Sequence, residues 1–443
     1  MPPNQQDILI IGGGIGGLTL ALALHARGIP CRVFEAVAEI KAIGVGINIL
    51  PHASQELAQL GLEDDLARVG VTTRDASFFN RFGQLIHREP LGRFAGYAHP
   101  QFSIHRGDLH QVLLDAVQAR LGAERIHLGW RCTGFTQDGG GVTVAFDDFS
   151  TGTARAAQRG GAAIACDGLH SVIRKQLHPG EGEPRYSGVN MWRGVTRMQP
   201  ILSGASMVRA GWLTHGKMVI YPIRHFEDGT QLMNWVAEIE TPHYQKRDWN
   251  RAGSRDDFIG LFESWRFDWL DVPAMIRGAD AVLEFPMIDQ DPLPWWTQGR
   301  VTLLGDAAHP MVPRGSNGAG QSIIDACTLA DCLAEGLAEG LTEGPADGLT
   351  AGLTEGLPQA AGAASGVAQS LKDYEARRLQ ATSNVVLTNR SNPPDAIIRV
   401  VYERNGDQPF ERIEDVISAA ELTAITDGYK RVAGYTKEGL AAR

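Results

Sequence analysis

The sequence predicts an α/β fold in which a Rossmann-like dinucleotide-binding domain is interleaved with a second domain on a mostly antiparallel sheet. A complete β-α-β unit occupies residues 7–35, and two later apolar strands end in turns that contain glycine and aspartate. Residues 186–285 differ, because alternating apolar runs rich in tryptophan and methionine appear there. Buried parallel strands are continuously apolar and half-exposed antiparallel strands alternate, so the two patterns predict two kinds of sheet.

The first unit opens with the apolar run DILII and continues into glycines at G-x-G-x-x-G spacing. In such a turn Gly12 permits the sharp bend, Gly14 lets a pyrophosphate approach the main chain, and Gly17 lets the following helix pack closely. Gly16 belongs to the same turn. A bare turn is the alternative, but the order of strand, glycines and helix favours a dinucleotide site.

The helix expected over residues 15–27 points its free N–H groups and positive dipole end toward bound phosphates. A second strand follows at residues 31–34 and ends in Glu35. This acid falls about twenty residues after the first glycine, where a carboxylate accepts hydrogen bonds from a ribose diol.

The composition excludes several kinds of partner. The 443 residues carry a formal net charge of −10, so no basic stripe for nucleic acid is expected. No apolar run reaches the length of a membrane span, and stable membrane insertion is not expected. The five cysteines form no C-x-x-C pair and indicate reduced thiols in a cytoplasmic protein. The histidines show no metal-ligand spacing, so no metal site is expected.

Two stretches after the first unit are candidates for cofactor contact. In AIGVGINI, Gly44 and Gly46 stand where the backbone passes close to something flat or bulky, with an ordinary glycine loop as the alternative. Arg106 directly precedes a helix in SIHRGDLHQVLLDAVQARL. A solvated surface role and a contact to a diphosphate remain equally open for this arginine.

The two later strands repeat the logic of the first unit. Residues 162–166 lead into Asp167 and Gly168, and residues 301–304 lead into Gly305 and Asp306. The carboxyl ends of parallel strands meet at one sheet edge, where ligands of open α/β folds bind, although a plain turn explains each pair locally. The loop PMVPRGSNGAG, residues 310–320, then offers N–H groups at a helix start to an anionic or electron-rich ligand edge.

The middle region supplies the substrate candidates. Arg193, in MWRG, is a candidate clamp for a carboxylate, with an ordinary strand-edge arginine as the alternative. Tyr221, Met233 and Trp235 are candidates for the wall of a flat aromatic pocket, with plain core packing as the alternative. Met233 and Trp235 are expected on one face of a strand and Asn234 on the other.

Residues 334–357 are a low-complexity run of tetrapeptides such as AEGL and TEGL. Each interior glycine costs a helix roughly 0.8 to 1.0 kcal/mol relative to alanine, so an irregular linker is expected there. A helix is expected to resume near Ser370, and the tail to Arg443 to be helical and peripheral.

The motifs GGGIGG with Glu35, CDGLHSVIR and GDAAHPMVPRGSNGAGQ follow one another in this order. Together they resemble the single-component FAD-dependent aromatic hydroxylases, the class A flavoprotein monooxygenases. GVGINI, SIHRGDLH and GRVTLLGDAAH resemble the branch that acts in phenazine biosynthesis. The resemblance covers residues 7–378 and implies an FAD-binding domain of the aromatic-hydroxylase, glutathione-reductase-like type with an interleaved α+β substrate domain.

On this resemblance, the FAD-binding domain comprises residues 1–75, 100–185 and 286–333, and the substrate domain residues 76–99 and 186–285. Residues 334–369 form the insert and residues 370–443 a C-terminal helical segment. The implied FAD contacts are Gly12, Gly14, Gly16, Gly17, Glu35, Gly44, Gly46, Arg106, Asp167, Gly168, Gly305, Asp306, Asn317, Gly318 and Ala319.

The resemblance also implies the chemistry. NADH or NADPH reduces FAD, O2 adds to give a flavin C4a-hydroperoxide, and oxygen is transferred to an aromatic or heteroaromatic, carboxylated, phenazine-like small molecule. The flavin carries this chemistry, so no catalytic side chain is assigned. A flavin-dependent epoxidase, a decarboxylating hydroxylase and a non-catalytic nucleotide-sensing flavoprotein are the alternatives.

Overall fold

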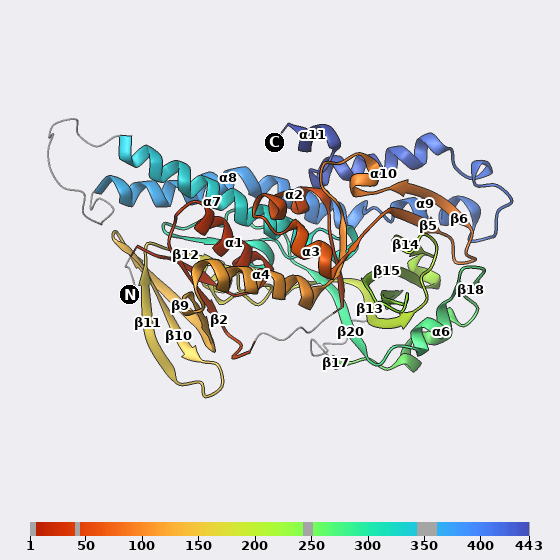
Figure 1. The fold of residues 1–443 in the computed structure, drawn as a ribbon, viewed down its shortest axis with the longest axis horizontal. Coiled ribbons are helices and arrows are strands. Elements are labelled where there is room, and N and C mark those ends of the chain that lie inside the picture. The colour runs from red at the N-terminus through yellow and green to blue at the C-terminus, as the bar shows by residue number, and fades with distance from the viewer. Residues whose placement is uncertain (1–5, 40–44, 242–250, 343–360, 443) are drawn as a thin grey trace.

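The computed structural model describes residues 6–39, 45–241, 251–342 and 361–442. Gly44 and residues 343–357 of the tetrapeptide run therefore lie outside the described residues. The parallel-sheet half and the antiparallel-sheet half lie side by side, and two long helices run along the first half (Figure 1).

The first half is built on a five-stranded parallel sheet with the order β21-β12-β1-β2-β8. Strands β1 and β12 at its centre are short, continuously apolar and buried, as the sequence predicts for a parallel sheet covered on both faces. The strands are β1 (Ile8–Ile11), β2 (Cys31–Glu35), β8 (Ile126–Leu128), β12 (Ala162–Ala165) and β21 (Val301–Leu303).

Helices and a small meander cover this sheet. Helix α1 packs against α7 and α4, and the three-stranded meander β11-β10-β9 packs beside β2 and β12. The helices are α1 (Ile15–Ala26), α2 (Pro51–Gln59), α3 (Glu63–Val69), α4 (Arg106–Leu121), α5 (Val172–Leu177), α7 (Gly318–Thr342) and α8 (Ala361–Ser391). The meander strands are β9 (Trp130–Asp138), β10 (Gly141–Asp148) and β11 (Ala154–Gly160).

The second half is built on an eight-stranded sheet with the order β17-β20-β13-β16-β15-β14-β5-β6. All neighbours are antiparallel except β14 and β5, and β5 and β6 form a hairpin. The strands are β5 (Asp75–Phe79), β6 (Leu85–Pro90), β13 (Arg185–Met198), β14 (Ser206–Ala210), β15 (Lys217–His225), β16 (Gln231–Glu240), β17 (Arg251–Ala252) and β20 (Val282–Asp289).

Smaller elements complete the chain. A three-stranded sheet, β3-β7-β4, contacts β15 of the large sheet, and β18 pairs with β19. These strands are β3 (Gly46–Ile49), β4 (Val71–Thr72), β7 (Phe102–His105), β18 (Arg266–Phe267) and β19 (Leu270–Asp271). The remaining helices are α6 (Val272–Arg277), α9 (Ala396–Asn405), α10 (Ala419–Ala433) and α11 (Lys437–Ala441).

The start of the tetrapeptide run is helical, which corrects the expectation of an irregular linker from Ala334 onward. Helix α7 continues to Thr342, and α8 begins at Ala361 rather than near Ser370. Helices α7 and α8 pack against each other, and Leu337 packs on the core of the first half. Burial against a neighbouring helix therefore outweighs the helix cost of Gly336.

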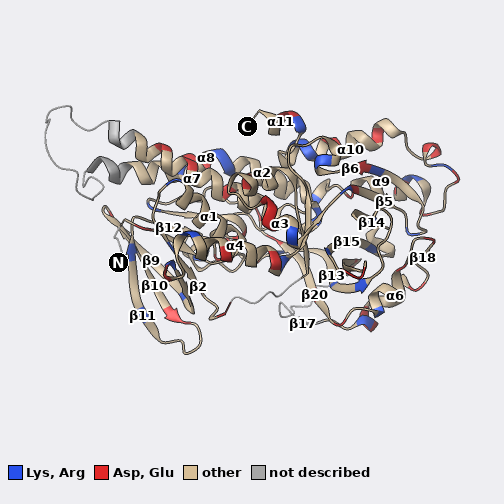
Figure 2. Ribbon diagram, viewed as in Figure 1, with Lys and Arg blue, Asp and Glu red and all other residues tan. Residues whose placement is uncertain are grey.

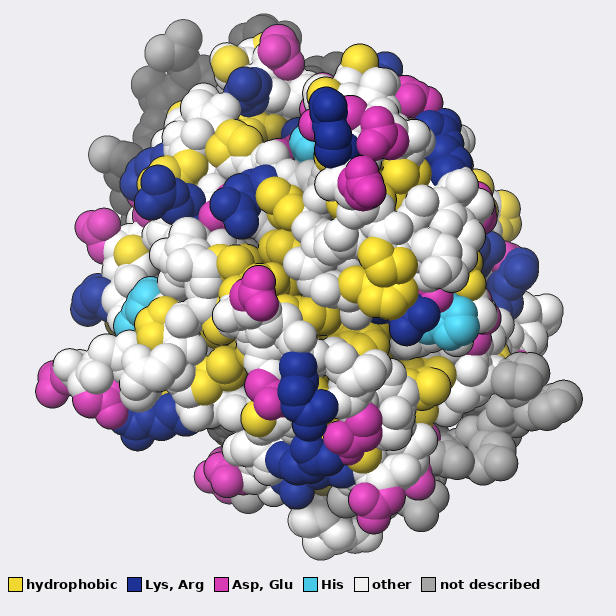
Figure 3. Space-filling model, turned by 90° about the vertical axis from the view of Figure 1, so that its right-hand side faces the viewer, with side chains coloured by type: hydrophobic (Ala, Val, Ile, Leu, Met, Phe, Trp, Pro, Cys, Tyr) yellow, Lys and Arg dark blue, Asp and Glu magenta, His cyan; other side chains and the backbone are white. Residues whose placement is uncertain are grey.

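Charged side chains of both signs are interspersed over both halves of the described chain (Figure 2). At the end of the molecule formed by the large sheet, hydrophobic side chains gather at the centre of the face between charged groups (Figure 3). No helix among the described residues is long and apolar enough to cross a membrane.

Candidate active site

The glycine turn between β1 and α1 keeps a space open in front of the helix. Gly12 has φ +110, and a Cβ there would overlap the carbonyl oxygen of Cys166. A Cβ on Gly17 would overlap the Gly12 carbonyl, whereas a Cβ on Gly14 would meet nothing within 4 Å. Gly16 instead packs toward β21 and α7. The turn is thus closed by Gly12 and Gly17 and left open to a ligand at Gly14.

The N-terminus of α1 fits an anionic group. Gly14 is its N-cap, no side chain caps the helix, and its first turn contains no acidic residue. The positive end of the helix dipole is therefore not offset within the helix, which suits a diphosphate.

Glu35 stands at the edge of the same turn. Its carboxylate accepts hydrogen bonds from the Gly13 N–H at 2.7 Å and the Val37 N–H at 2.9 Å. The position is the one expected for a ribose contact. His110 of α4, which the sequence did not single out, lies with Nε2 2.6 Å from the Gly13 carbonyl oxygen and helps to hold the turn.

Arg106 is the first residue of α4 and is exposed. Its backbone N–H donates to the Val45 carbonyl oxygen at 3.0 Å, so the start of α4 is joined to the loop before β3. Gly46 begins β3 at the end of this loop, while Gly44 lies outside the described residues.

The two acid-bearing turns lie beside the glycine turn. The Cys166 N–H donates to the Ile11 carbonyl at 2.7 Å, and the Leu304 N–H donates to the Ala165 carbonyl at 2.9 Å. Strands β1, β12 and β21 therefore end side by side, as expected for the carboxyl edge of a parallel sheet. Gly168 has φ +74, a left-handed conformation that favours glycine.

Asp167 and Asp306 differ in their surroundings. Asp167 Oδ2 accepts from the Val172 N–H at 3.0 Å, and burial raises the pKa of Asp167. Asp306 is exposed, and its Oδ1 lies 3.8 Å from where a Cβ of Gly318 would stand. The Asp306 carboxylate thus faces the start of α7, where Gly318 and Ala319 are partly exposed and lie in the first turn.

Arg174, just after the turn at Asp167 and Gly168, links that turn to the one at Gly305 and Asp306. It is buried, and its Nη1 donates to the carbonyl oxygens of Ala307 and Ala308 at 2.8 and 2.9 Å. Its Nε donates to Glu181 at 2.7 Å. The guanidinium is therefore a structural link at this edge of the sheet.

Asp325 of α7 contacts the turn at Gly305 and Asp306. The sequence analysis did not single out this residue. Its carboxylate accepts from the Gly305 N–H at 3.1 Å, lies 2.6 Å from His309 Nε2, and accepts from Arg378 Nε at 2.7 Å. Burial alone would raise the pKa of Asp325, but His309 and Arg378 hold it below its ordinary value.

A polar cluster joins the large sheet to β3. The Gly46 N–H donates to Asn234 Oδ1 at 2.7 Å, and Arg193 Nη2 donates to the Gly46 carbonyl at 2.9 Å. A Cβ on Gly46 would lie 2.6 Å from the Tyr221 ring and 2.7 Å from Asn234. Gly46 is therefore needed for the close approach of this loop to the sheet.

Two groups of this cluster carry unused hydrogen-bonding capacity. Arg193 Nε and Asn234 Nδ2 are buried atoms without a hydrogen-bond partner. Burial lowers the pKa of Arg193, and burial raises the pKa of Tyr221, whose hydroxyl also bonds Arg193 and Asn48. Tyr221 is thus neutral at ordinary pH and stands beside a guanidinium.

An apolar wall continues from this cluster toward the loop that precedes α7. The wall joins β13, β15, β16 and β20 to Val312 of that loop. Its buried members are Val189, Met191, Leu213, Val236, Met287 and Val312, and the partly buried Trp212, Val219 and Phe285 pack against them.

Met233 and Trp235 belong to the other face of the sheet, which corrects their placement in the pocket. Both are fully buried in the core beneath α6, and Trp235 Nε1 donates to Thr196 Oγ1 at 3.1 Å. Side chains alternate along a strand, so Asn234 and Val236 point toward β3 and the loop instead. The available signal in the sequence was the polar Asn234 between the large apolar residues Met233 and Trp235. This alternation does not say which face of the strand meets a ligand.

The C-terminal segment is not peripheral, contrary to expectation. Tyr429 of α10 is buried, and its hydroxyl accepts from Asn317 Nδ2 at 2.8 Å. The Asn317 side chain also lies 3.1 Å from His52 Nε2. The loop predicted to face the flavin is thus bonded by its asparagine to elements at both ends of the chain.

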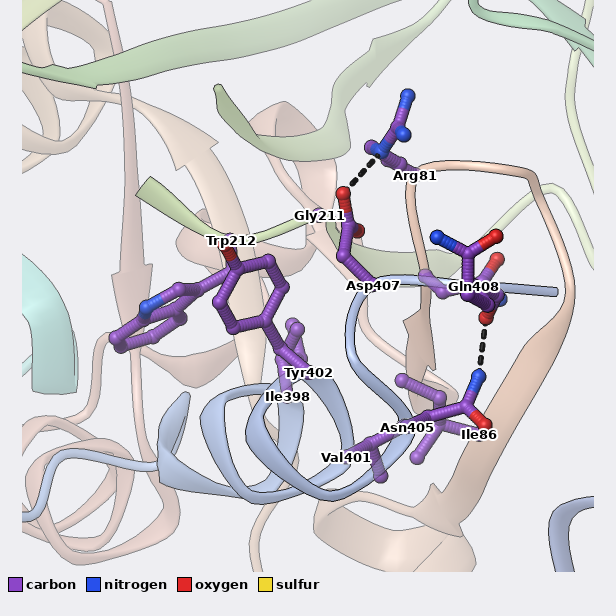
Figure 4. A pocket seen from close by; sticks show the side chains of 11 residues that line it. Arg81, Ile86, Gly211, Trp212, Ile398, Val401, Tyr402, Asn405, Asp407 and Gln408 are labelled. Atoms are coloured by element: carbon purple, nitrogen blue, oxygen red, sulfur yellow. Dashed lines mark hydrogen bonds and ion pairs between the residues drawn. The ribbon is translucent and has the colours of Figure 1, made fainter. Parts of the chain in front are cut away.

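A separate, small hollow lies between the β5–β6 turn, Trp212 and α9 (Figure 4). Arg81 Nε lies 2.8 Å from Asp407 Oδ2 at its rim. Trp212 also packs on the apolar wall. No residue of the glycine or aspartate turns lines the hollow, so it is not part of the cofactor site.

The comparisons agree with this geometry. The family model that describes an FAD binding domain matches residues 5–361. The chain belongs to this family and is an NAD(P)H-dependent flavoprotein monooxygenase that uses FAD and O2. The predictions of the family, the fold class, the cofactors and the class of enzyme are therefore confirmed.

Individual relatives are aromatic hydroxylases. The phenazine 1,6-dicarboxylic acid hydroxylase PhzS of Lysobacter antibioticus is 37% identical over 435 residues, covering 97% of this chain and 97% of the relative. The 3-amino-4-hydroxybenzoate 2-monooxygenase PtmB3 of Streptomyces platensis is 34% identical over 336 residues, covering 74% of this chain and 80% of the relative. The fold matches Klebsiella pneumoniae HpxO complexed with FAD and uric acid, with a TM-score of 0.70, 23% identity, and coverage of 98% of this chain and 97% of that chain.

Proposed function

We propose that this enzyme hydroxylates a carboxylated aromatic or heteroaromatic ring, of the size and shape of a phenazine, between the large sheet and the loop before α7. The observation that carries the proposal is the position of Arg193 beside Tyr221 at the edge of the apolar wall. A flat ring suits the wall, and a guanidinium suits the carboxylate. The relative named for phenazine 1,6-dicarboxylic acid supports the same substrate class.

Arg193 lacks a counter-ion in the described part of the chain. Its Nη2 is bonded to the neutral Gly46 carbonyl, and no ion pair joins it to a described carboxylate. Arginine keeps its charge in proteins, and a partly buried charge without a partner is costly. A substrate carboxylate would complete this site through the free Nε edge.

The chain's own residues supply binding and orientation. In the proposal, the N-terminus of α1 holds the diphosphate of FAD, Glu35 its ribose, Asp306 its ribityl chain, and the first turn of α7 the edge of the ring. Bound FAD, reduced by NADH or NADPH, supplies activated oxygen from O2. The apolar wall keeps water away from the reacting ring.

The unpaired cysteines favour a reducing compartment, and we place the enzyme in the cytoplasm on this ground. A small aromatic molecule is the proposed partner. The oxygen-transfer route expected from the resemblance is part of the same proposal.

A panel of aromatic and phenazine carboxylates tests the function. The purified holoenzyme should oxidise NADH or NADPH faster with a suitable member of the panel and should add one oxygen atom to it, as measured by product mass. Loss of carbon dioxide together with oxygen gain would indicate a decarboxylating hydroxylase. Stoichiometric hydrogen peroxide with every compound would contradict hydroxylation of this substrate class.

A further inference from the structure

The loop between β21 and α7 has a backbone conformation that needs support. Ser316 has φ +55, a left-handed conformation that is uncommon for a residue with a side chain. Such conformations persist where the surrounding structure fixes them. The loop carries Val312 of the apolar wall on one side and Asn317, at the start of α7, on the other.

A directed chain of hydrogen bonds joins the two sides of this loop through the C-terminal segment. Asn317 Nδ2 donates to Tyr429 Oη at 2.8 Å, and Tyr429 Oη donates to Asn389 Oδ1 at 2.7 Å. Asn389 Nδ2 then donates to the Val312 carbonyl oxygen at 3.4 Å. The hydroxyl of Tyr429 is the centre of this chain, since it accepts from one side of the loop and donates toward the other.

Tyr429 is fitted closely to the loop. A Cβ on Gly315 would overlap the Tyr429 hydroxyl oxygen, so the glycine and the tyrosine are matched. Tyr429 is buried, and this burial raises its pKa. The hydroxyl therefore keeps the proton that it donates to Asn389.

The segment that carries Tyr429 and Asn389 is itself anchored. Asp395, between α8 and α9, lies with Oδ1 3.0 Å from Arg209 Nε of β14 and also pairs with Lys217 of β15. At the end of α10, the ring of Tyr435 stacks on His52 with centroids 5.2 Å apart. The C-terminal segment is thus fastened to both halves of the molecule and can act as a fixed support.

We propose that Tyr429 is a positioning residue of the flavin site, which holds the loop Val312–Asn317 in the conformation that contacts the isoalloxazine ring. This inference rests on the proposed placement of the ring beside the first turn of α7. Tyr429 acts through Asn317 and Asn389 and does not itself touch the reacting atoms. The C-terminal helices are then part of the cofactor site.

The test is Tyr429→Phe in the full-length holoenzyme, which keeps the ring and removes both hydrogen bonds. Loss of a buried neutral hydrogen bond changes a conformational equilibrium by about fivefold. We expect a rise of that order in the fraction of reducing equivalents lost as hydrogen peroxide. The visible spectrum and the midpoint potential of bound FAD should shift as well, which a purely structural role far from the flavin would not cause.

Tyr435→Phe is the matched control, because it removes a buried hydroxyl from the same segment and keeps the ring that stacks on His52. Its flavin spectrum and peroxide fraction should be those of the wild type. Asn389→Leu removes the acceptor of the Tyr429 hydroxyl and should reproduce the effect of Tyr429→Phe. It provides the same measurement if the Tyr429→Phe variant does not fold.

A Tyr429→Phe or Asn389→Leu enzyme with wild-type spectrum, potential and peroxide fraction would overturn the inference. Failure of the proposed function would give a different result from failure of this inference. In that case no carboxylated aromatic is hydroxylated by the wild type, while the flavin spectrum and potential can still be compared between the variants.

Discussion

Replacing Arg193 by alanine should weaken the binding of a carboxylated substrate by roughly tenfold to a hundredfold. A hydrogen bond to a charged partner contributes about 1.5 to 3 kcal/mol, and every 1.4 kcal/mol is a factor of ten in the dissociation constant. The Nε atom of the guanidinium is unpaired, whereas Nη2 is bonded to the Gly46 carbonyl. The expected loss is that of one charged hydrogen bond, made by Nε.

The assay is a titration of oxidised holoenzyme with a phenazine or benzoate carboxylate and with its neutral carboxamide, followed by flavin absorbance. Arg193→Ala should lose affinity for the carboxylate and change little toward the carboxamide. FAD content should be unchanged, since Arg193 lies on the large sheet and not in the glycine or aspartate turns. Arg197→Ala is the matched control on the same strand, where the exposed side chain pairs with Asp228 at 2.7 Å. Equal losses for carboxylate and carboxamide, or none for either, would refute the assignment of Arg193 to the carboxylate.

Two further predictions concern the glycine turn before α1 and the buried Asp325 of α7. Gly14→Ala should weaken FAD binding, because the added methyl group enters the open space, and should leave the thermal stability of the apoprotein near that of the wild type. Gly17→Ala should instead destabilise the apoprotein itself, because its methyl group would overlap the Gly12 carbonyl. Thermal melts of the apoproteins and FAD titrations separate these effects, and equal melts would contradict the packing role of Gly17. Asp325→Asn should destabilise the protein by about 3 to 5 kcal/mol, the usual cost of breaking a buried charge pair. The folded-state pKa of Asp325 is lowered, so its contribution is present above its ordinary pKa and declines as pH falls through the folded-state value. In denaturant unfolding, the difference in the free energy of unfolding between wild type and variant should become smaller at acid pH. A difference that stays constant with pH would argue against ionised Asp325 as its cause.

The glycine and aspartate turns at the carboxyl edge of the parallel sheet could be predicted from local sequence, because each turn is short and has its own pattern. A buried strand, a glycine at a required bend and an acid at the strand end lie within a few residues of one another. The parallel pairing of β1, β12 and β21 then brings the separate turns to one edge, as the general rule for such sheets predicts.

The roles of residues on the eight-stranded sheet were less predictable. The alternation in β16 separates Met233 and Trp235 from Asn234, but both faces of this strand are buried. Hydrophobicity therefore could not tell which face meets α6 and which meets β3. Met233 and Trp235, predicted as candidates for the pocket wall, lie in the core that packs against α6.

The sequence by itself determined the class of fold, the glycine and aspartate turns at the ends of the parallel strands, and the family, because these depend on backbone conformation and spacing within short segments. Only the tertiary structure decided which face of β16 packs against α6 and which meets β3, that α7 continues into the tetrapeptide run, and that Tyr429 bonds to Asn317 at the start of α7. Each of these results depends on packing between segments far apart in the chain. The hydrogen bond between Asn317 and Tyr429 spans 112 positions, and no local pattern in either segment specifies the other.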